Sequence, residues 1–343
     1  MFGRRLMVLV SVLALSPVSG AVAAPSTVDT LFSSQAKELP ADLIDAVRRD
    51  LGIDAPTYLE QAWRASGRPE SPLERPLRTL LPSRGIAAGM GLRLTDASRA
   101  PAGLCTLGFL AVDGKGRSTP LTAGHCAALT RAENASLEQG GVVGRFDTVR
   151  FDDLGSGGKG EDYATLRVTN PWLRPAAEVI DQRGGRVPVE GVVAPVEGMP
   201  VCKSGRTTGW TCGRVRKERV HAVSGTTGRR IAAFAHTACS GIGDSGAPVL
   251  SGTMAVGILQ GGTQGPGGRC RADSGGEDAA VAESLVQDVL PNFPGSLYVL
   301  TTTGDQDGDG VPDIDELAAD PTAVRDDNGN GVPAFLDPAE RAR

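Results

Sequence analysis

Short apolar stretches separated by Gly, Pro and polar clusters make up most of the chain between residues 86 and 300. Apolar stretches of about four to eight residues, bounded by turn residues, are typical of β-strands. Many short strands at even spacing predict an all-β barrel or sandwich. The clearest predicted strands are 107–112, 141–146, 164–168, 192–196, 230–234, 247–250 and 255–259.

Apolar residues at helical spacing occur on both sides of this region, which predicts helices there. Before it, two short helices are expected, followed by a polar, Pro-rich linker at 68–76. Their apolar positions are Leu43, Ile44, Val47, Leu51, Leu59, Ala62 and Trp63. After it, one helix near the end is expected from Val281, Leu285, Val286, Val289 and Leu290.

The first 23 residues have the pattern of a secretory signal peptide. Arg4 and Arg5 precede an apolar run at 6–15, and small residues at 21–23 resemble a cleavage site. The alternative is a membrane anchor, but the run is shorter than the roughly 20 residues of a spanning helix. No later segment is apolar enough to span, so the sequence predicts an extracellular protein without a membrane span.

The change from helical to strand-rich pattern suggests a domain organisation. We expect a helical pro-segment and linker at 24–85, a main domain at 86–300 and a tail at 304–343. A helical piece before a β-rich one resembles a removable pro-segment, which predicts a zymogen. The alternative is a permanent N-terminal subdomain.

Composition and charge sharpen this division. Aromatic residues make up only 4%, while the chain contains 46 Gly and 23 Pro, which favours strands and turns over long helices. The net charge is −5, and from Asp305 onward acidic residues outnumber basic ones by 11 to 3. The acidity therefore belongs to the tail, and no basic cluster indicates a nucleic-acid partner.

Six cysteines, an even number in an exported chain, predict disulfide bonds. Several pairings remain open on the sequence alone. No pair has the Cys-x-x-Cys spacing of a zinc site, so thiolate metal binding is not expected. The cysteines are Cys105, Cys126, Cys202, Cys212, Cys239 and Cys270.

Three motifs bring the residues of a catalytic triad into the order His, Asp, Ser. His125 lies in LTAGHC (121–126), Asp162 in EDYA (161–164) and Ser245 in GDSG (243–246). A serine hydroxyl is a weak nucleophile until a base takes its proton, and a carboxylate can orient that base. Asp152 and Asp153 are rival carboxylates.

The glycines around Ser245 allow a tight turn in which the N–H groups of Gly243 and Ser245 face one oxygen. Two such donors would stabilise an oxyanion. A lone GDSG run is also compatible with an ordinary β-turn. Together with the other two motifs, it predicts an enzyme that cuts peptide bonds.

Five motifs in the same order resemble the chymotrypsin-type serine proteases of the bacterial branch, those of alpha-lytic protease and the streptogrisins. The resemblance implies two perpendicular six-stranded antiparallel β-barrels with a C-terminal helix and the triad between the barrels. It also implies the pairs Cys105–Cys126, Cys202–Cys212 and Cys239–Cys270. The matching runs are 105–109, 121–126, 161–164, 201–213 and 238–246.

Three positions depart from the family pattern. Ala247 follows GDSG where the family has Gly, a small change if its φ is negative. Gln260 replaces a Ser that often supports the triad aspartate. Lys203 replaces an arginine, and we expect it to pair with Asp244.

By the same resemblance, Ser240, Leu259, Gly261 and Gly262 line the pocket for the residue before the cut. None is acidic, so nothing there would pair with Arg or Lys of a substrate. No histidine marks a site for Glu. We therefore expect a preference for medium-sized apolar residues.

The acidic tail contains a calcium-loop pattern, with oxygen ligands at positions 1, 3, 5, 7, 9 and 12 and Gly at 6. The alternative is a solvated acidic run. A poorer copy follows at 326–337, where Ala334 replaces a ligand. The Val-Pro after each Gly resembles thrombospondin type 3 repeats. The ligands of the first loop would be Asp305, Asp307, Asp309, the carbonyl of Val311, Asp313 and Glu316.

The sequence thus predicts a secreted serine endopeptidase acting on proteins or peptides, monomeric, made with its own pro-segment as partner. Catalysis needs no cofactor, and Ca²⁺ is expected in the tail. One rival is an adhesion protein in which the protease fold is only a scaffold. A narrower rival is an esterase on the same fold.

Overall fold

The computed structural model describes residues 85–139, 141–170, 173–224, 226–262, 280–319, 326–330 and 332–340. The chain divides into two units, Met1–Ser83 and Arg84–Arg343, and all described residues belong to the second. The predicted signal peptide and pro-segment lie outside the described residues, apart from Gly85. In the described part, no helix is long and apolar enough to cross a membrane.

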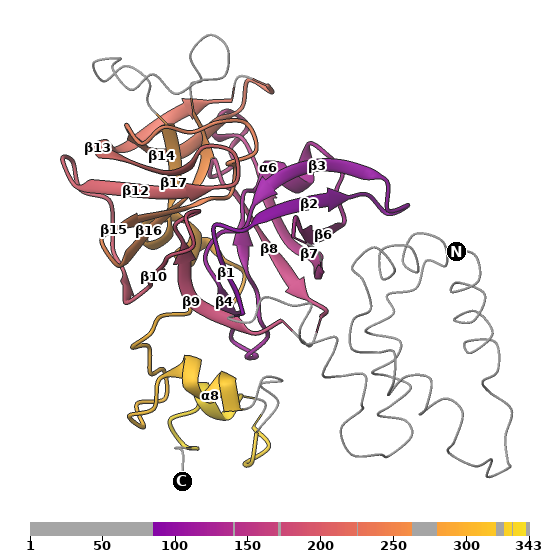
Figure 1. Ribbon diagram of the computed structural model, residues 1–343, viewed down its shortest axis with the longest axis vertical. Coiled ribbons are helices and arrows are strands. Elements are labelled where there is room, and N and C mark those ends of the chain that lie inside the picture. Colours follow the sequence, from indigo (N-terminus) through magenta and orange to yellow (C-terminus); the bar gives the residue numbers. More distant parts are fainter. Residues whose placement is uncertain are drawn as a thin grey trace, which may run out of the picture. The chain divides into compact units, whose positions relative to one another are not determined.

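The first half of the described chain forms a six-stranded antiparallel sheet (Figure 1). Gly108 donates to the carbonyl of Leu121 at 2.7 Å, and Leu121 donates to that of Phe109 at 2.9 Å. These bonds connect the residues that follow one edge strand to the strand at the opposite edge, so the sheet curls into a barrel. Across the sheet the strands are β3 (Pro101–Thr106), β2 (Gly91–Thr95), β6 (Asn134–Leu137), β7 (Val142–Phe151), β8 (Asp162–Val168) and β5 (Leu121–Thr122).

The second half forms a closed barrel. Its sheet has seven strands, and an additional pairing between β16 and β17 joins six of them into a ring. The remaining strand, β11 (Gly191–Val192), runs parallel to β16 at the side. The ring contains β16 (Met254–Gly261), β15 (Pro248–Ser251), β12 (Pro200–Gly205), β13 (Gly209–Val223), β14 (Arg230–His236) and β17 (Ala280–Ser284).

Each barrel is filled by side chains that alternate along its strands, because successive residues point to opposite faces. In the first barrel, β6 buries Ala135 and Leu137, and the adjacent β2 buries Leu92 and Leu94. The core of the second barrel comes from the strands of its ring and consists of Val201, Val215, Phe234, Ala247, Val249, Val256, Leu259, Ala280 and Ala282.

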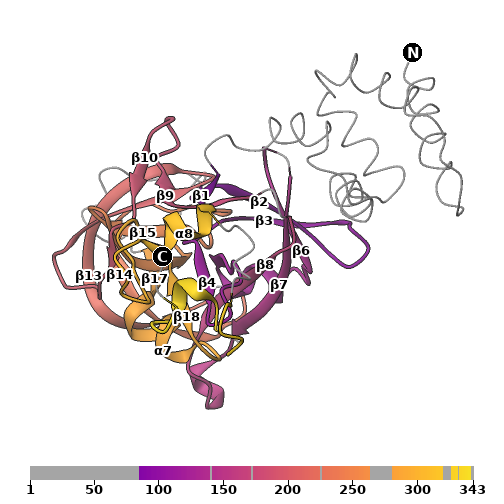
Figure 2. The ribbon, with the colours of Figure 1, turned by 90° about the horizontal axis from the view of Figure 1, so that it is seen from below.

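Smaller elements surround the barrels (Figure 2). Three strands, β1 (Ile86–Ala88), β9 (Pro175–Ile180) and β10 (Arg186–Pro188), form a separate sheet, and β4 (Ala111–Asp113) pairs with β18 (Leu297–Val299). The short helices are α6 (Gly124–Ala128), η1 (Leu154–Ser156), η2 (Leu285–Val289), α7 (Leu290–Asn292), α8 (Asp313–Ala319) and η3 (Ala334–Leu336).

The expected two-barrel, all-β fold is confirmed, but three local predictions are wrong. The expected strand at 107–112 is reduced to β4, and that at 192–196 to the end of β11. The C-terminal helix begins at Leu285, since Val281 lies in β17. That strand pairs with both β14 and β16, so the pairing that closes the barrel outweighs the helical spacing of its apolar residues.

Candidate active site

His125 and Asp162 are joined by two hydrogen bonds. The His125 backbone N–H donates to Asp162 Oδ1 at 2.7 Å, and His125 Nδ1 lies 2.8 Å from Asp162 Oδ2. His125 lies in α6, and Asp162 is the first residue of β8. Both carboxylate oxygens therefore hold one residue, which fixes the imidazole and leaves Nε2 as its other polar atom.

Burial and charge oppose each other at this pair. Burial disfavours the imidazolium form of His125, but the charge of Asp162 and its hydrogen bond outweigh burial and raise the pKa of His125. The Asp162 side chain is 2% exposed and that of His125 is 20% exposed. A base with a raised pKa next to a buried carboxylate is suited to accept a proton and hold it briefly.

A second carboxyl group, not found from the sequence, lies directly behind Asp162. Glu283 Oε2 accepts the Asp162 backbone N–H at 2.9 Å and the Gln260 side-chain amide at 3.0 Å. Glu283 is fully buried, and burial and the charge of Asp162 raise its pKa well above the usual value, which favours the neutral acid. Gln260 therefore reaches Asp162 indirectly, through Glu283.

The rival carboxylates, Asp152 and Asp153, accept backbone hydrogen bonds at the loop before β8. Asp152 Oδ1 accepts the N–H of Glu161 at 2.8 Å, and Asp153 Oδ1 accepts those of Gly155 and Arg230. Of the three carboxylates considered, Asp162 is the one in contact with His125.

The other two histidines lie in strands. His221 is exposed on β13, whereas His236 is fully buried on β14. Burial, with a smaller contribution from Lys203, lowers the pKa of His236 to about 3. A histidine in that environment stays neutral, so His236 is a core residue.

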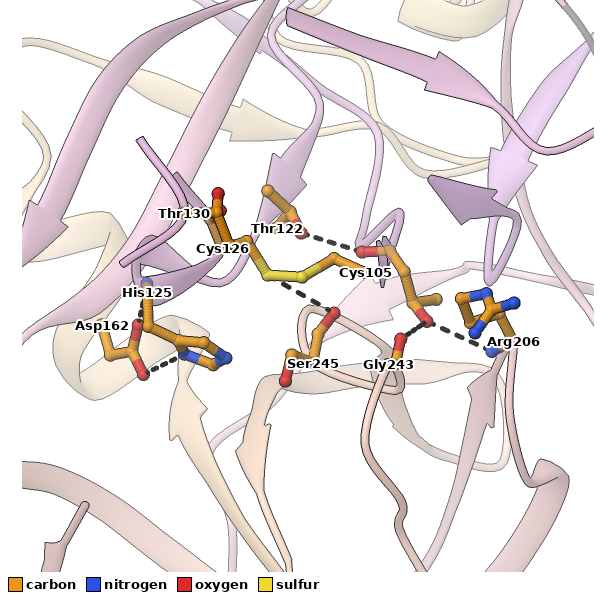
Figure 3. The surroundings of a disulfide bond; sticks show 10 residues. Cys105, Thr122, His125, Cys126, Thr130, Asp162, Arg206, Gly243 and Ser245 are labelled. Atoms are coloured by element: carbon orange, nitrogen blue, oxygen red, sulfur yellow. Dashed lines mark hydrogen bonds and ion pairs between the residues drawn. A yellow bond between two sulfur atoms is a disulfide. The ribbon is translucent and has the colours of Figure 1, made fainter. Parts of the chain in front are cut away.

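Ser245 lies in the loop between β14 and β15, and Figure 3 shows the imidazole of His125 between Asp162 and Ser245. The loop needs glycine on both sides of the serine. Gly243 has φ +95° and Gly246 has φ +88°, and a Cβ on Gly246 would lie 2.2 Å from Thr122 Oγ1. Ala247 has no positive φ and packs in the second core, so its methyl group causes no backbone strain.

A buried ion pair anchors the residue before the serine. Lys203 Nζ lies 3.1 Å from Asp244 Oδ2, and neither side chain is exposed, which confirms the expected pair. Burial raises the pKa of Asp244, but the charge of Lys203 and hydrogen bonds from Thr208, Gly241 and Thr207 reverse this and lower it.

The residues predicted to form the substrate pocket come from two segments. Leu259 is buried in the second core, and a Cβ on Gly262 would lie 2.8 Å from Ser240 Cβ. Among the described residues, a Cβ on Gly261 would meet nothing within 4 Å. The structure therefore brings Ser240 against Gly262 and leaves space at Gly261.

Two of the disulfides implied by the resemblance are present. Cys105–Cys126 links β3 to the helix of His125, and Cys202–Cys212 crosses the β12–β13 hairpin. Cys239 is also disulfide-bonded, and its expected partner Cys270 lies outside the described residues.

The first loop of the tail gathers carboxylates. Oxygens of Asp305, Asp307 and Asp309 lie within 4.8 Å of one another. Asp307 is 3% exposed, yet within the described part of the chain its Oδ2 has no hydrogen-bond partner, and neither does Oε2 of Glu316. Burial and the neighbouring aspartates raise the pKa of Asp313 to about 6 and that of Glu316 to about 7.

The second loop of the tail is arranged around one carboxylate. Side-chain amides of Asn328 and Asn330 donate to Asp337 Oδ2 at 2.8 and 2.7 Å. Asp326 Oδ1 accepts the backbone N–H of Asn330. Both oxygens of Asp337 are thus bonded within the loop, since Oδ1 accepts the N–H of Ala339, whereas Oδ2 of Asp307 in the first loop has no partner among the described residues.

Comparisons with known proteins agree with this geometry. A family model described as Trypsin matches residues 116–276. Streptogrisin-C of Streptomyces griseus is 33% identical over 47% of this chain, and Glutamyl endopeptidase 2 of the same organism is 32% identical over 46%. These alignments cover 33% and 78% of the two relatives, and another, to Serine protease 1 of Rarobacter faecitabidus, covers 28%. The chain thus spans about a third or less of the length of two of these relatives.

Among solved structures, a glutamic acid-specific serine protease, described as using a histidine triad in substrate binding, matches with a TM-score of 0.50. It is 25% identical, and the match covers 62% of this chain and all of that one. The motifs, the two barrels and these relatives lead to one conclusion: the chain belongs to the chymotrypsin-type serine proteases of the bacterial branch.

Proposed function

We propose that this protein is a secreted serine endopeptidase that hydrolyses peptide bonds through an acyl-enzyme. Ser245 is the nucleophile, His125 the general base and Asp162 the residue that orients it. The observation that carries the proposal is the pair of hydrogen bonds, at 2.7 and 2.8 Å, by which Asp162 holds His125 beside Ser245.

The proposed reaction begins with proton transfer from Ser245 Oγ to His125 Nε2, because Nδ1–H is donated to Asp162. The serine oxygen attacks the substrate carbonyl carbon, and the resulting oxyanion accepts hydrogen bonds from the N–H groups of Gly243 and Ser245. His125 then passes the proton to the leaving amine. Water, activated by the same histidine, releases the acyl group in the second half.

Kinetics with paired substrates separate this proposal from its rivals. The wild type should cleave a quenched-fluorescence peptide, and Ser245→Ala should reduce the rate to background. Ser251→Ala, at the end of β15, is the matched serine control and should retain the wild-type rate. Cleavage of esters but not amides would indicate an esterase. If folded wild type cleaves neither substrate, the result would favour an adhesion protein in which the protease fold is only a scaffold.

We propose a preference for medium-sized apolar residues before the cut. No acidic residue is present among Ser240, Leu259, Gly261 and Gly262. The chain has three histidines, and one of them is His125, so it has too few for a separate histidine triad like that named for its structural relative. A peptide-library profile dominated by Arg, Lys or Glu would contradict the preference.

We also propose that residues 1–23 direct export and that residues 24–85 are removed as a pro-segment. The support is the sequence pattern and the division of the chain at Ser83. N-terminal sequencing of secreted protein should find a mature end between residues 84 and 104. A secreted protein beginning at residue 24 would show a permanent subdomain instead.

A calcium ion in the first tail loop is the second proposal. Calcium takes six to eight hard oxygen ligands, at about 2.3–2.6 Å. The buried Asp307, whose Oδ2 has no hydrogen-bond partner among the described residues, supports a cation at this loop, because buried carboxylates need a partner. Asp305, Asp309, Asp313, Glu316 and the Val311 carbonyl would complete the shell.

Calcium would stabilise the tail and take no part in the reaction. Calorimetric titration of the full chain should show one site that Asp307→Asn abolishes. Asp315→Asn, an exposed aspartate between two proposed ligands, is the control and should retain the site. The absence of heat at millimolar calcium would exclude it.

A further inference from the structure

The two N–H groups assigned to the oxyanion hole belong to peptides whose carbonyls each accept a hydrogen bond. Ala247 N–H donates to the Asp244 carbonyl at 2.8 Å, and Thr207 Oγ1 donates to the Ile242 carbonyl at 2.7 Å. In a trans peptide, C=O and N–H point in opposite directions. The N–H groups of Ser245 and Gly243 therefore point away from the groups that bond the two carbonyls. Neither N–H has an acceptor among the described residues.

The two peptides differ in how firmly they are held. The one before Ser245 lies between Asp244 and Ala247, both fully buried. The one before Gly243 lies next to Ile242, whose side chain is 86% exposed. Gly243, which has no Cβ and a φ of +95°, offers little steric resistance to rotation at its end of that peptide. In the described part of the chain, the Thr207 hydroxyl is the one group bonded to its carbonyl.

The direction of the Thr207 hydroxyl is itself fixed. Arg206 Nη1 donates to Thr207 Oγ1 at 3.2 Å, and a guanidinium can only donate. The hydroxyl hydrogen is therefore directed to the Ile242 carbonyl. Arg206 in turn is held by Glu138 through two bonds of 2.7 Å, and Thr207 N–H donates to Asp244 Oδ1 at 2.8 Å.

We propose that Thr207 is a positioning residue for the oxyanion hole. Its hydroxyl keeps the peptide between Ile242 and Gly243 in the orientation that presents the Gly243 N–H to the substrate oxygen. Arg206, in the turn between β12 and β13 of the second barrel, fixes the direction of the hydroxyl, and Glu138 of the first barrel holds Arg206. Figure 3 shows Arg206 close to Gly243. The inference rests on the proposed endopeptidase activity and deepens it, since Thr207 acts through Gly243 without touching the reacting atoms.

The test compares Thr207→Val, which keeps the shape and loses the hydroxyl, with Thr207→Ser, which keeps the hydroxyl. Thr227→Val, in an exposed turn, is the matched control. Loss of a whole oxyanion donor costs about 10²–10³-fold in kcat, so a loosened donor should cost about ten-fold. We expect that loss for Thr207→Val with KM unchanged, and values within about two-fold of wild type for the other two variants.

A peptide aldehyde gives an independent readout, because its adduct with serine places an oxyanion in the hole. Its inhibition constant should rise for Thr207→Val by the factor by which kcat falls, while a non-covalent peptide inhibitor should bind as in the wild type. If Thr207→Val proves unfolded by circular dichroism, Thr207→Ala provides the same comparison.

Wild-type kcat and aldehyde inhibition in the folded hydroxyl-free variant would overturn the proposal. So would an equal loss in Thr207→Ser, which would show a purely structural role. Failure of the proposed function itself looks different: the wild type would then neither hydrolyse peptides nor form the adduct.

Discussion

Carboxylates are buried in two regions of this molecule, and their charges are balanced in opposite ways. Between the barrels, both oxygens of Asp162 are bonded to His125, and Asp244 lies against Lys203. In the first tail loop, Asp307 is equally buried but has an unpartnered oxygen. There burial and the neighbouring acids raise the pKa values of Asp313 and Glu316 to about 6 and about 7.

The difference shows what each region needs from outside. A buried carboxylate is stable only when hydrogen bonds or an opposite charge replace water. Between the barrels, Asp162 and Asp244 find both among neighbouring residues of the protein. Glu283 has an Oε1 without a hydrogen-bond partner among the described residues, and burial raises its pKa, which favours the neutral acid. In the tail loop, backbone N–H groups satisfy several carboxylate oxygens, and the external cation that we propose would balance the remaining negative charge.

The largest expected effect comes from changing the internally balanced carboxylate that orients the base. Asp162→Asn should lower kcat by about 10⁴-fold, because the amide no longer selects the tautomer that leaves Nε2 free. Steady-state kinetics on a peptide amide would measure this. Asp153→Asn, which changes a carboxylate of the neighbouring loop, is the control, and an equal loss there would contradict the assignment.

The second largest effect is expected on stability, when the positive charge of Lys203 beside Asp244 is removed. Lys203→Met leaves a buried unpaired carboxylate, which costs about 3–5 kcal/mol of stability. Urea unfolding in a Ser245→Ala background would avoid autolysis. Lys203→Arg keeps the charge and should lose much less, so similar losses in both variants would point to packing instead of charge.

Calcium should stabilise the tail loop and leave the barrel carboxylates unaffected. A ligand at about 100 times its Kd adds about 2.7 kcal/mol, which corresponds to a rise in Tm of roughly 5–10 °C for a domain of this size. Thermal unfolding of Ser245→Ala with calcium or a chelator would show it, and Asp307→Asn should remove the rise. Equal Tm values in calcium and chelator would refute the external cation.

The smallest effect is expected at Glu283, where the group is already neutral. Glu283→Gln should change kcat/KM by less than about two-fold, whereas Glu283→Ala should lose about ten-fold because the Asp162 N–H loses its acceptor. Equal losses in the two variants would contradict the positioning role.

The protonation state of Glu283 can also be tested by the pH dependence of stability. Since the folded pKa of Glu283 is raised, the folded state keeps a proton that the unfolded state releases above about pH 4.5. Wild-type stability should therefore fall with rising pH above that value, relative to Glu283→Gln. Parallel curves for the two proteins would show that Glu283 is ionised in the folded protein.

Local motifs and the family resemblance pointed to the candidate site residues, whereas contacts between distant segments of the chain were not predicted. The flanks of His125, Asp162 and Ser245 point to them because each role requires particular neighbours, and the family resemblance predicted the pair of Lys203 and Asp244. Glu283 was missed because it lies 121 residues from Asp162 and its run has helical spacing. Its burial depends on β17 closing the barrel, which no local pattern of apolar residues specifies.

The most direct test of the account is whether Ser245 is an activated nucleophile. Secreted protein would be treated with a fluorophosphonate probe and mapped by mass spectrometry, beside Ser245→Ala. The account predicts a single adduct on Ser245 that is absent from the variant. Folded, processed protein without an adduct, or with the adduct on another residue, would contradict it.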